Sequence, residues 1–545
     1  MKTTENPVVL FQTSPEQYKH WKLEISGPVA RLSMDVQEDE TLVEGYKLKL
    51  NSYDLGVDIE LADAIQRIRF EHPEVRAVVI TSLKPRIFCA GANIYMLGSS
   101  SHAFKVNFCK FTNETRCVIE DDSKHSGRRY IAALNGTASG GGYELAIACD
   151  EIYLVDDGNS AVSLPEVPLL GVLPGTGGLT RLVDKRKVRR DRADVFSTLA
   201  EGLRGKRAKE WGLIDDYFPT SKFQQSIDSR VEQIVAVQSQ PASGIKLTPL
   251  QFDSTDDSRN YKYVKIKLHR EQRYADLTVH GPEGSQPTNP DDIQKLGDAY
   301  WPLQAYRELD DALLHLRVNE PLIGLVCVRT EGNIDDVLAV DQTLAANRDH
   351  WLMREIVLHM ARVLRRFDLT AKSFFAIVEP GSCFAGNLLE LLLASDRSYM
   401  LSDSDASLAI SELNAGAFPM SNGLTRLQSR FLAEPDKLDE VFEKKTFDTE
   451  EAEELGLVTF APDDLDWKDE IRVAIEERTS LSPDALTGME ASLRFAGPET
   501  MDTKIYGRLT AWQNWIFQRP NAVGEKGALT NYGKPTQAEF DYKRT

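Results

Sequence analysis

The sequence predicts an α/β fold in which one large domain occurs twice along the chain. Strand-like and helix-like segments alternate through the first half, as they do in sheets built from crossover connections. The second half repeats the order, and part of the sequence, of the first. With 545 residues, 42% of them hydrophobic, the chain is long enough to form two large cores.

Hydrophobic spacing assigns the elements of the first half. Segment 57–73 has apolar residues at helical spacing and stops at Pro73, whereas 75–82 is a continuous β-branched run typical of a buried parallel strand. Residues 1–25 are expected to be an irregular lead-in. The expected elements are a strand over 29–36, a helix over 57–73, a strand over 75–82, a helix over 102–122, and strands over 128–136 and 151–157.

The duplication sets the expected domains. Three segments of the second half, 374–401, 407–427 and 447–462, resemble 130–155, 163–182 and 203–219 in that order. The polar, turn-rich region between the halves, interrupted by strand-like 263–269, favours a linker. We therefore predict one domain over 1–240 with its N-terminal lead-in, a linker region over 241–300, and a second domain with a C-terminal helical tail over 301–545.

Composition excludes several classes of protein. A formal net charge of −19 argues against a nucleic-acid partner. The six cysteines form no CxxC pair and the nine histidines show no ligand spacing, which argues against structural zinc, a disulfide framework or any other metal site. No apolar run has the length of a membrane span. We expect a cytoplasmic protein without a membrane partner.

Two glycine-rich segments carry the first chemical signal. FCAGAN (88–93) follows a strand, and SGGGYE (139–144) opens a helix. Glycines let the backbone approach a ligand, and the first N–H groups of a helix are unpaired and lie at its positive end. The N–H groups of Ala92 and Gly141, aimed at one oxygen, would form an oxyanion hole.

Two glutamates accompany these segments. Glu144 lies in the apolar run after the glycines, and Glu166 precedes another apolar run. Two carboxylates beside one site can divide the roles of acid and base when their surroundings separate their pKa values. Either glutamate alone could equally be an exposed helix or loop residue, but the ordered set of segments favours a site.

The ordered set resembles the crotonase (enoyl-CoA hydratase/isomerase) superfamily over residues 25–225. The resemblance is carried by the AGA loop, the GGGYE helix start, PEVPLLGVLPGTGGLTRL (165–182) and a helix ending in GLID. It implies a CoA thioester whose carbonyl oxygen lies between the N–H groups of Ala92 and Gly141, with Glu144 and Glu166 as acid/base residues. It implies no metal or organic cofactor, because CoA is part of the substrate.

The same resemblance describes the second half as a decayed copy. The three glycines become AGN (385–387), whereas Glu390 and Glu412 match Glu144 and Glu166. The predicted architecture is therefore two tandem crotonase-like domains of ββα repeats, the C-terminal one degenerate. Because each chain carries two domains, we expect a homo-oligomer, most simply a homodimer.

Length and pairing of domains also bear on activity. A chain of this length, with an active-looking first domain and a decayed second one, resembles a ring-opening branch of this superfamily, which implies hydrolytic opening of a ring derived from an aromatic CoA thioester with release of formate. The resemblance to this branch implies a carbon–carbon lyase. An enoyl-CoA hydratase or isomerase acting on another acyl-CoA, and a non-catalytic acyl-CoA-binding protein, remain as alternatives.

The remaining candidates line the expected acyl pocket. Cys109, Phe104 and Phe108 lie in HAFKVNFCKF (102–111), where an aromatic acyl group would need an aromatic wall and a thiol could assist ring opening. A structural cysteine and core aromatics are the plainer interpretation. Lys47 is a candidate contact for the CoA phosphates. The basic run over 185–192 is a second candidate, although a solvated helix face is the favoured interpretation.

Overall fold

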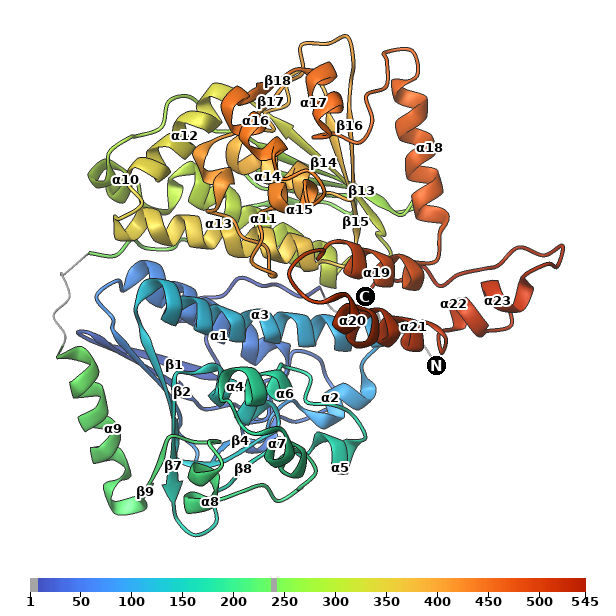
Figure 1. Ribbon diagram of the computed structural model, residues 1–545. Helices are drawn as coiled ribbons and strands as arrows, with labels where there is room; N and C mark the ends of the chain where they lie inside the picture. Colours follow the sequence, from blue (N-terminus) through green and yellow to red (C-terminus); the bar gives the residue numbers. More distant parts are fainter. Residues whose placement is uncertain (1–7, 237–242) are drawn as a thin grey trace. The chain divides into compact units, whose positions relative to one another are not determined.

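The computed structural model describes residues 8–236 and 243–545, and divides into two compact units, Met1–Pro249 and Leu250–Thr545 (Figure 1). The expected boundary between residues 240 and 241 lies outside the described residues. Most of the region expected to be a linker, 241–300, is folded into the second unit, where its strands join the main sheet. Polar turn residues between these short strands gave the region its linker-like composition.

The first unit contains a twisted sheet with the strand order β1-β2-β3-β5-β7-β9. β1 and β2 pair antiparallel, and all later neighbours pair parallel. The strands are β1 (Trp21–Ser26), β2 (Val29–Met34), β3 (Ala77–Ser82), β5 (Arg129–Leu134), β7 (Glu151–Asp156) and β9 (Asp216–Pro219). The expectation of an irregular lead-in over residues 1–25 is wrong for Trp21–Ser26, which forms a strand. One face of this strand is exposed, so it contains no long apolar run from which a strand could be predicted.

A second, smaller parallel sheet gives the unit its repeat. It has the order β4 (Arg86–Cys89), β6 (Gly136–Ser139) and β8 (Val162–Ser163). After β3, β5 and β7 the chain enters β4, β6 and β8 respectively and then a helix. This is the ββα repeat that the crotonase resemblance implies. In each repeat a loop connects the short strand to the following helix, so three equivalent loops lie at the ends of the small sheet.

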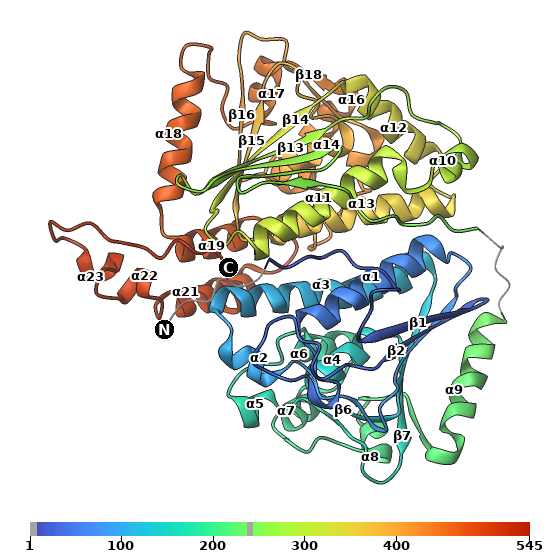
Figure 2. The same ribbon diagram turned by 180° about the vertical axis from the view of Figure 1, so that it is seen from behind.

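The helices of the first unit cover this frame. α1 and α3 lie side by side (Figures 1 and 2). α9 packs its apolar side chains Phe223 and Ile227 against Val79 and Ile131 of the sheet. The helices are α1 (Leu55–Glu71), α2 (Ile94–Ser99), α3 (His102–Ser126), α4 (Gly141–Ala148), α5 (Glu166–Leu170), α6 (Gly178–Thr180), α7 (Arg190–Ser197), α8 (Gly205–Glu210) and α9 (Thr220–Val235).

The second unit has its own sheet, with strands in simple sequence order from β10 to β16. β10 to β13 pair antiparallel, and β13 to β16 pair parallel. The strands are β10 (Asp253–Ser254), β11 (Ser258–Asn260), β12 (Val264–His269), β13 (Tyr274–His280), β14 (Leu325–Glu331), β15 (Ser373–Val378) and β16 (Arg397–Met400), with a separate pair β17 (Leu408–Ala409) and β18 (Thr446–Phe447).

From β12 onward the pairing pattern matches that of the first unit. An antiparallel pair is followed by parallel neighbours, and a long helix comes between the second and third strands of the series. The helices are α10 (Pro290–Leu296), α11 (Trp301–Val318), α12 (Ile334–Ala346), α13 (Trp351–Leu369), α14 (Gly386–Ala394), α15 (Arg426–Arg430), α16 (Lys437–Lys444), α17 (Thr449–Leu455), α18 (Trp467–Ser480), α19 (Pro483–Leu493), α20 (Met501–Lys504), α21 (Thr510–Ile516), α22 (Pro520–Val523) and α23 (Ala528–Asn531).

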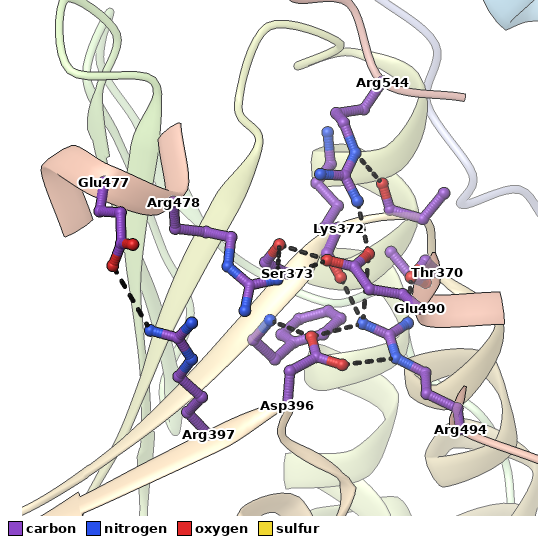
Figure 3. A network of polar contacts seen from close by, with 12 residues as sticks. Thr370, Lys372, Ser373, Asp396, Arg397, Glu477, Arg478, Glu490, Arg494 and Arg544 are labelled. Atoms are coloured by element: carbon purple, nitrogen blue, oxygen red, sulfur yellow. Dashed lines mark hydrogen bonds and ion pairs between the residues drawn. The ribbon is translucent and has the colours of Figure 1, made fainter. Parts of the chain in front are cut away.

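A buried polar network attaches the C-terminal helices to this second sheet (Figure 3). The Glu490 carboxylate on α19, only 2% exposed, accepts hydrogen bonds from Ser373 at the start of β15 and from Arg544 near the chain end, the latter at 2.5 Å. Arg494 pairs with Asp396 at 2.7 Å and donates to the carbonyl of Thr370. Because a buried charge is costly without partners, these pairs fix the position of α19.

Candidate active site

The two glycine-rich segments meet at the start of α4. Gly91 and Gly140 have left-handed φ angles of +89° and +53°. A Cβ atom at Gly91 would lie 2.8 Å from the backbone nitrogen of Gly141, and one at Gly142 would lie 2.3 Å from the carbonyl oxygen of Cys89. Only glycine permits this approach of the two backbones, which brings Ala92 next to the start of α4.

The backbone groups of Ala92 and Gly141 lie where the two glycine-rich segments meet. Tyr53 donates its N–H to the Gly91 carbonyl and accepts from the Asn93 N–H, at 3.0 and 2.8 Å. Successive backbone groups of an extended segment point in opposite directions, so the N–H of Ala92 faces away from this pairing. Gly141 is the first residue of α4, where an N–H has no acceptor within the helix. The two predicted oxyanion residues thus lie in adjoining segments, and their role in holding an oxyanion stays a prediction.

Glu144 lies on α4, one turn beyond Gly141, and is 2% exposed. Its Oε1 accepts hydrogen bonds from the N–H groups of Thr176 and Gly178 at 2.9 and 2.8 Å, and its Oε2 accepts one from the Thr176 hydroxyl. α4 and α6 lie side by side (Figure 1), which places the PGTGG segment over this carboxylate. The protein's own donors therefore hold both oxygens of this carboxylate in place.

Glu166 begins α5 and lies beside the same glycine turn. A Cβ atom at Gly140 would be 2.7 Å from its Oε1. Its other oxygen, Oε2, is buried and accepts no hydrogen bond from any described residue. Burial, together with the nearby charge of Glu144, raises the pKa of Glu166 to about 7. The two glutamates therefore differ in their surroundings, because both oxygens of Glu144 accept hydrogen bonds whereas Oε2 of Glu166 accepts none from a described residue; their acid and base roles stay predictions.

Cys109 lies on α3 and faces the PGTGG segment. A Cβ atom at Gly175 would be 3.3 Å from its Sγ. Burial, followed by the charges of Glu144 and Asp58, raises the pKa of the thiol to about 11. At neutral pH the group is a thiol rather than a thiolate, so it can donate a proton or a hydrogen bond and is a poor nucleophile.

The residues expected to line the acyl pocket differ in how deeply they are buried. Phe108 is buried, with its ring centroid 6.0 Å from that of Tyr53, whereas Phe104 is partly exposed one turn earlier on α3. Lys47 is exposed, and its Nζ pairs with Asp39 at 2.8 Å. The roles of Phe104, Phe108 and Lys47 in substrate binding stay predictions.

The basic run over 185–192 is engaged with the protein itself. Lys185 contacts Glu120 at 3.0 Å, Arg186 contacts Asp215 at 2.9 Å, and Arg189 pairs with a neighbouring carboxylate. Residues 186–189 lie outside any helix, so the favoured interpretation of a solvated helix face does not describe them, and a contact of this run with the CoA phosphates stays a prediction.

Sequence reasoning missed three supports of the site. Thr176 holds Glu144, although its position inside PGTGG could have suggested a donor. Arg116 on α3 forms a buried ion pair with Asp58 at 2.7 Å, and its guanidinium lies 5.4 Å from the centre of the Tyr53 ring. Tyr53 itself precedes α1 in a segment with no sequence signal for a functional role.

The described residues hold neither a metal-binding cluster nor a membrane-spanning helix. Within residues 8–236 and 243–545, no three His, Cys, Asp or Glu side chains are grouped so as to hold a metal ion. No helix in the described part of the chain combines the length and apolarity needed to cross a membrane.

The comparisons with known proteins first define a class. Residues 47–272 match the family described as enoyl-CoA hydratase/isomerase. The fold of ββα repeats and the paired glycine segments agree with this match, and the chain belongs to this family, which is the crotonase superfamily of the sequence analysis.

A more particular similarity extends over nearly the whole chain. Benzoyl-CoA-dihydrodiol lyase of Aromatoleum evansii is 55% identical over 543 residues, which cover 98% of each chain. Solved structures match shorter parts. An enoyl-CoA hydratase of Geobacillus kaustophilus is 33% identical, with a TM-score of 0.35, over 40% of this chain and 75% of its own. One of Bacillus anthracis is 26% identical, with a TM-score of 0.34, over 40% and 77%.

Proposed function

We propose that this protein opens the ring of 2,3-epoxybenzoyl-CoA, whose hydrate is the 2,3-dihydrodiol of benzoyl-CoA, by hydrolysis. The products are 3,4-dehydroadipyl-CoA semialdehyde and formate, and the reaction belongs to aerobic benzoate degradation. The observation that carries the proposal is the 55% identity to benzoyl-CoA-dihydrodiol lyase over 98% of both chains. Identity of this extent includes both units, whereas hydratase similarity covers less than half of the chain.

The oxyanion pair would act on the thioester carbonyl. The N–H groups of Ala92 and Gly141 stabilise negative charge that develops on this oxygen when electrons from the ring are drawn toward it. The thioester thereby serves as an electron sink while a ring bond breaks. Atom balance requires two water molecules per turnover: the epoxide-derived ring and two waters give one formic acid and the six-carbon semialdehyde thioester.

The two glutamates would divide the proton transfers. Glu144, whose carboxylate is oriented by three donors, would accept a proton from an attacking water. Glu166, with its pKa raised to about 7, holds a proton in a substantial fraction of molecules at neutral pH and is suited to donate it to the oxygen of the opening epoxide. The Cys109 thiol, which keeps its proton at neutral pH because burial raises its pKa to about 11, would assist as a second donor.

We also propose that the second unit is a degenerate crotonase-like domain. Its strand pairing from β12 onward follows that of the first unit, and α14 takes the place of α4. Glu390, the match of Glu144, is bound by Arg426 at 2.9 Å and by Asn414 at 2.7 Å. Glu412, the match of Glu166, is exposed. Neither carboxylate is available to a substrate in a common site.

The start of α14 supports this further, because a side chain of the same unit occupies it. The Asp341 carboxylate on α12 accepts hydrogen bonds from the Asn387 N–H at 2.8 Å, the Asn387 side-chain amide at 2.6 Å and the Ser411 hydroxyl at 2.6 Å. A Cβ atom at Gly386 would lie 2.0 Å from this carboxylate. An internal anion thus fills the position that an oxyanion would take.

Formate release from 2,3-epoxybenzoyl-CoA tests the activity, with crotonyl-CoA as the control substrate. Stoichiometric formate without hydration of crotonyl-CoA is the expected result. Hydration of crotonyl-CoA without formate would instead identify a duplicated enoyl-CoA hydratase or isomerase. Binding of both thioesters without reaction of either would identify an acyl-CoA-binding protein.

The remaining proposals concern the working form of the protein. We expect a homodimer in the cytoplasm, active without metal or organic cofactor. Light scattering of the purified protein measures the mass, and assay after exhaustive dialysis against EDTA tests the cofactor expectation. Activity that returns only on adding a metal would contradict it.

A further inference from the structure

The Tyr53 hydroxyl is the second buried polar group without a partner beside the glycine turn. Tyr53 is 1% exposed, and its hydroxyl forms no hydrogen bond to any residue in the described parts of the chain. A buried hydroxyl that lacks a partner is destabilising, and a ligand that supplies the partner removes this cost. The reaction described above does not use this residue.

The position of the hydroxyl is fixed by its surroundings. The Tyr53 backbone pairs with the segment around Ala92, and the ring is held between Phe108 and Arg116. The hydroxyl oxygen would lie 2.0 Å from a Cβ atom at Gly141, so it is in contact with the Cα of that glycine. The side chain therefore reaches the residue whose N–H forms half of the oxyanion hole.

The two unpartnered groups lie along the same short stretch of backbone. The Glu166 carboxylate abuts Gly140, and the Tyr53 hydroxyl abuts Gly141. We propose that Tyr53 is a third oxyanion donor, whose hydroxyl donates a hydrogen bond to the substrate's thioester carbonyl oxygen beside the N–H groups of Ala92 and Gly141. This inference rests on the proposed function for the identity of the substrate, but needs only a CoA thioester in the site.

The chemistry of the hydroxyl fits a donor. Burial raises the pKa of Tyr53 well above its ordinary value, which keeps the proton on the oxygen throughout the working pH range. A neutral phenol beside a developing oxyanion stabilises it without contributing a competing negative charge. The absence of an internal partner means that no protein hydrogen bond has to be broken when the substrate binds.

The variant Tyr53→Phe removes the hydroxyl and keeps the ring that packs on Phe108. Loss of one oxyanion donor lowers turnover by about a hundredfold. We expect this loss of kcat with formate release, while the melting temperature stays the same or rises, because an unsatisfied group has been removed. The matched control is Tyr130→Phe, whose buried hydroxyl donates to Asp122 at 2.7 Å: it should lower the melting temperature and leave turnover unchanged.

A spectroscopic measurement separates this inference from the proposed function. Benzoyl-CoA labelled with ¹³C at its carbonyl is bound to wild type and to each variant, and the infrared shift of the carbonyl band is recorded. A smaller red shift in Tyr53→Phe than in wild type supports the donor even if wild type releases no formate, an outcome that would refute only the proposed reaction. An unchanged band overturns the assignment, whether or not turnover falls.

Discussion

Helices α4 and α14 begin with similar backbones but meet different partners. Gly140 before α4 and Gly386 in α14 both have left-handed φ angles, +53° and +47°. At α14 the Asp341 carboxylate accepts the available hydrogen bonds. At α4 the Tyr53 hydroxyl and one oxygen of Glu166 are buried without a partner among the described residues.

This difference separates a structural arrangement from a functional one. A network whose donors and acceptors are all matched contributes to stability, whereas unmatched buried groups cost free energy and persist where a ligand completes them. At the start of α14 the second unit supplies its own acceptor, Asp341, whereas at the start of α4 two buried oxygens are unmatched among the described residues.

The largest effect is expected from Glu166→Gln. It removes a proton donor at the site and should lower kcat for formate release by about 10²- to 10⁴-fold. The matched control is Glu412→Gln in the second unit, where the side chain is exposed and turnover should stay at the wild-type level. Equal losses in the two variants would contradict the assignment of catalysis to the first unit.

The same variant should stabilise the folded protein at high pH. Burial raises the pKa of Glu166 from 4.5 to about 7, so folding favours the protonated acid. Below pH 4.5 the carboxyl is protonated in both the folded and the unfolded state and does not lower the stability. As the pH rises from 4.5 through 7 the unfolded state loses this proton more easily, so the free energy of unfolding falls by up to about 3 kcal/mol. Urea unfolding should show Glu166→Gln to be more stable than wild type at pH 8 but not at pH 4.5. Equal stability at pH 8 would refute the raised pKa.

Asp341→Ala should lower the stability of the protein and leave turnover unchanged. It leaves the Asn387 N–H and the Ser411 hydroxyl without their acceptor, which should lower the free energy of unfolding by about 2 kcal/mol. Thermal denaturation measures the loss, and formate release should not change. A loss of turnover in a folded Asp341→Ala protein would show that the second unit takes part in the reaction.

The smallest effect is expected at Cys109. Because burial raises the pKa of this thiol to about 11, it can assist as a donor but not as a thiolate. We expect Cys109→Ala to lower kcat by about tenfold, the value of one modest hydrogen bond, and Cys109→Ser to keep most of the activity. A loss in both variants as large as that of Glu166→Gln would instead indicate covalent catalysis.

The local pattern of apolar residues predicts most of the helices and strands of the first unit. The helix expected over 57–73 is Leu55–Glu71 and the strand expected over 75–82 is Ala77–Ser82, because apolar spacing reports which face of an element is buried. Pattern failed for Trp21–Ser26, which has an exposed face, and for 241–300, where short strands joined by polar turns have the composition of a linker.

The sequence by itself determined the α/β class, the order of the ββα repeats and the candidates Ala92, Gly141, Glu144 and Glu166, because glycines and carboxylates in a fixed order are visible along the chain. Only the tertiary structure decided which side chains complete each helix start. Tyr53 reaches Gly141 across 88 positions, and Asp341 reaches Asn387 across 46. Such contacts form only when the chain folds, because they join residues that are far apart in the sequence. No local periodicity of the sequence predicts whether a buried oxygen has a hydrogen-bond partner within the protein.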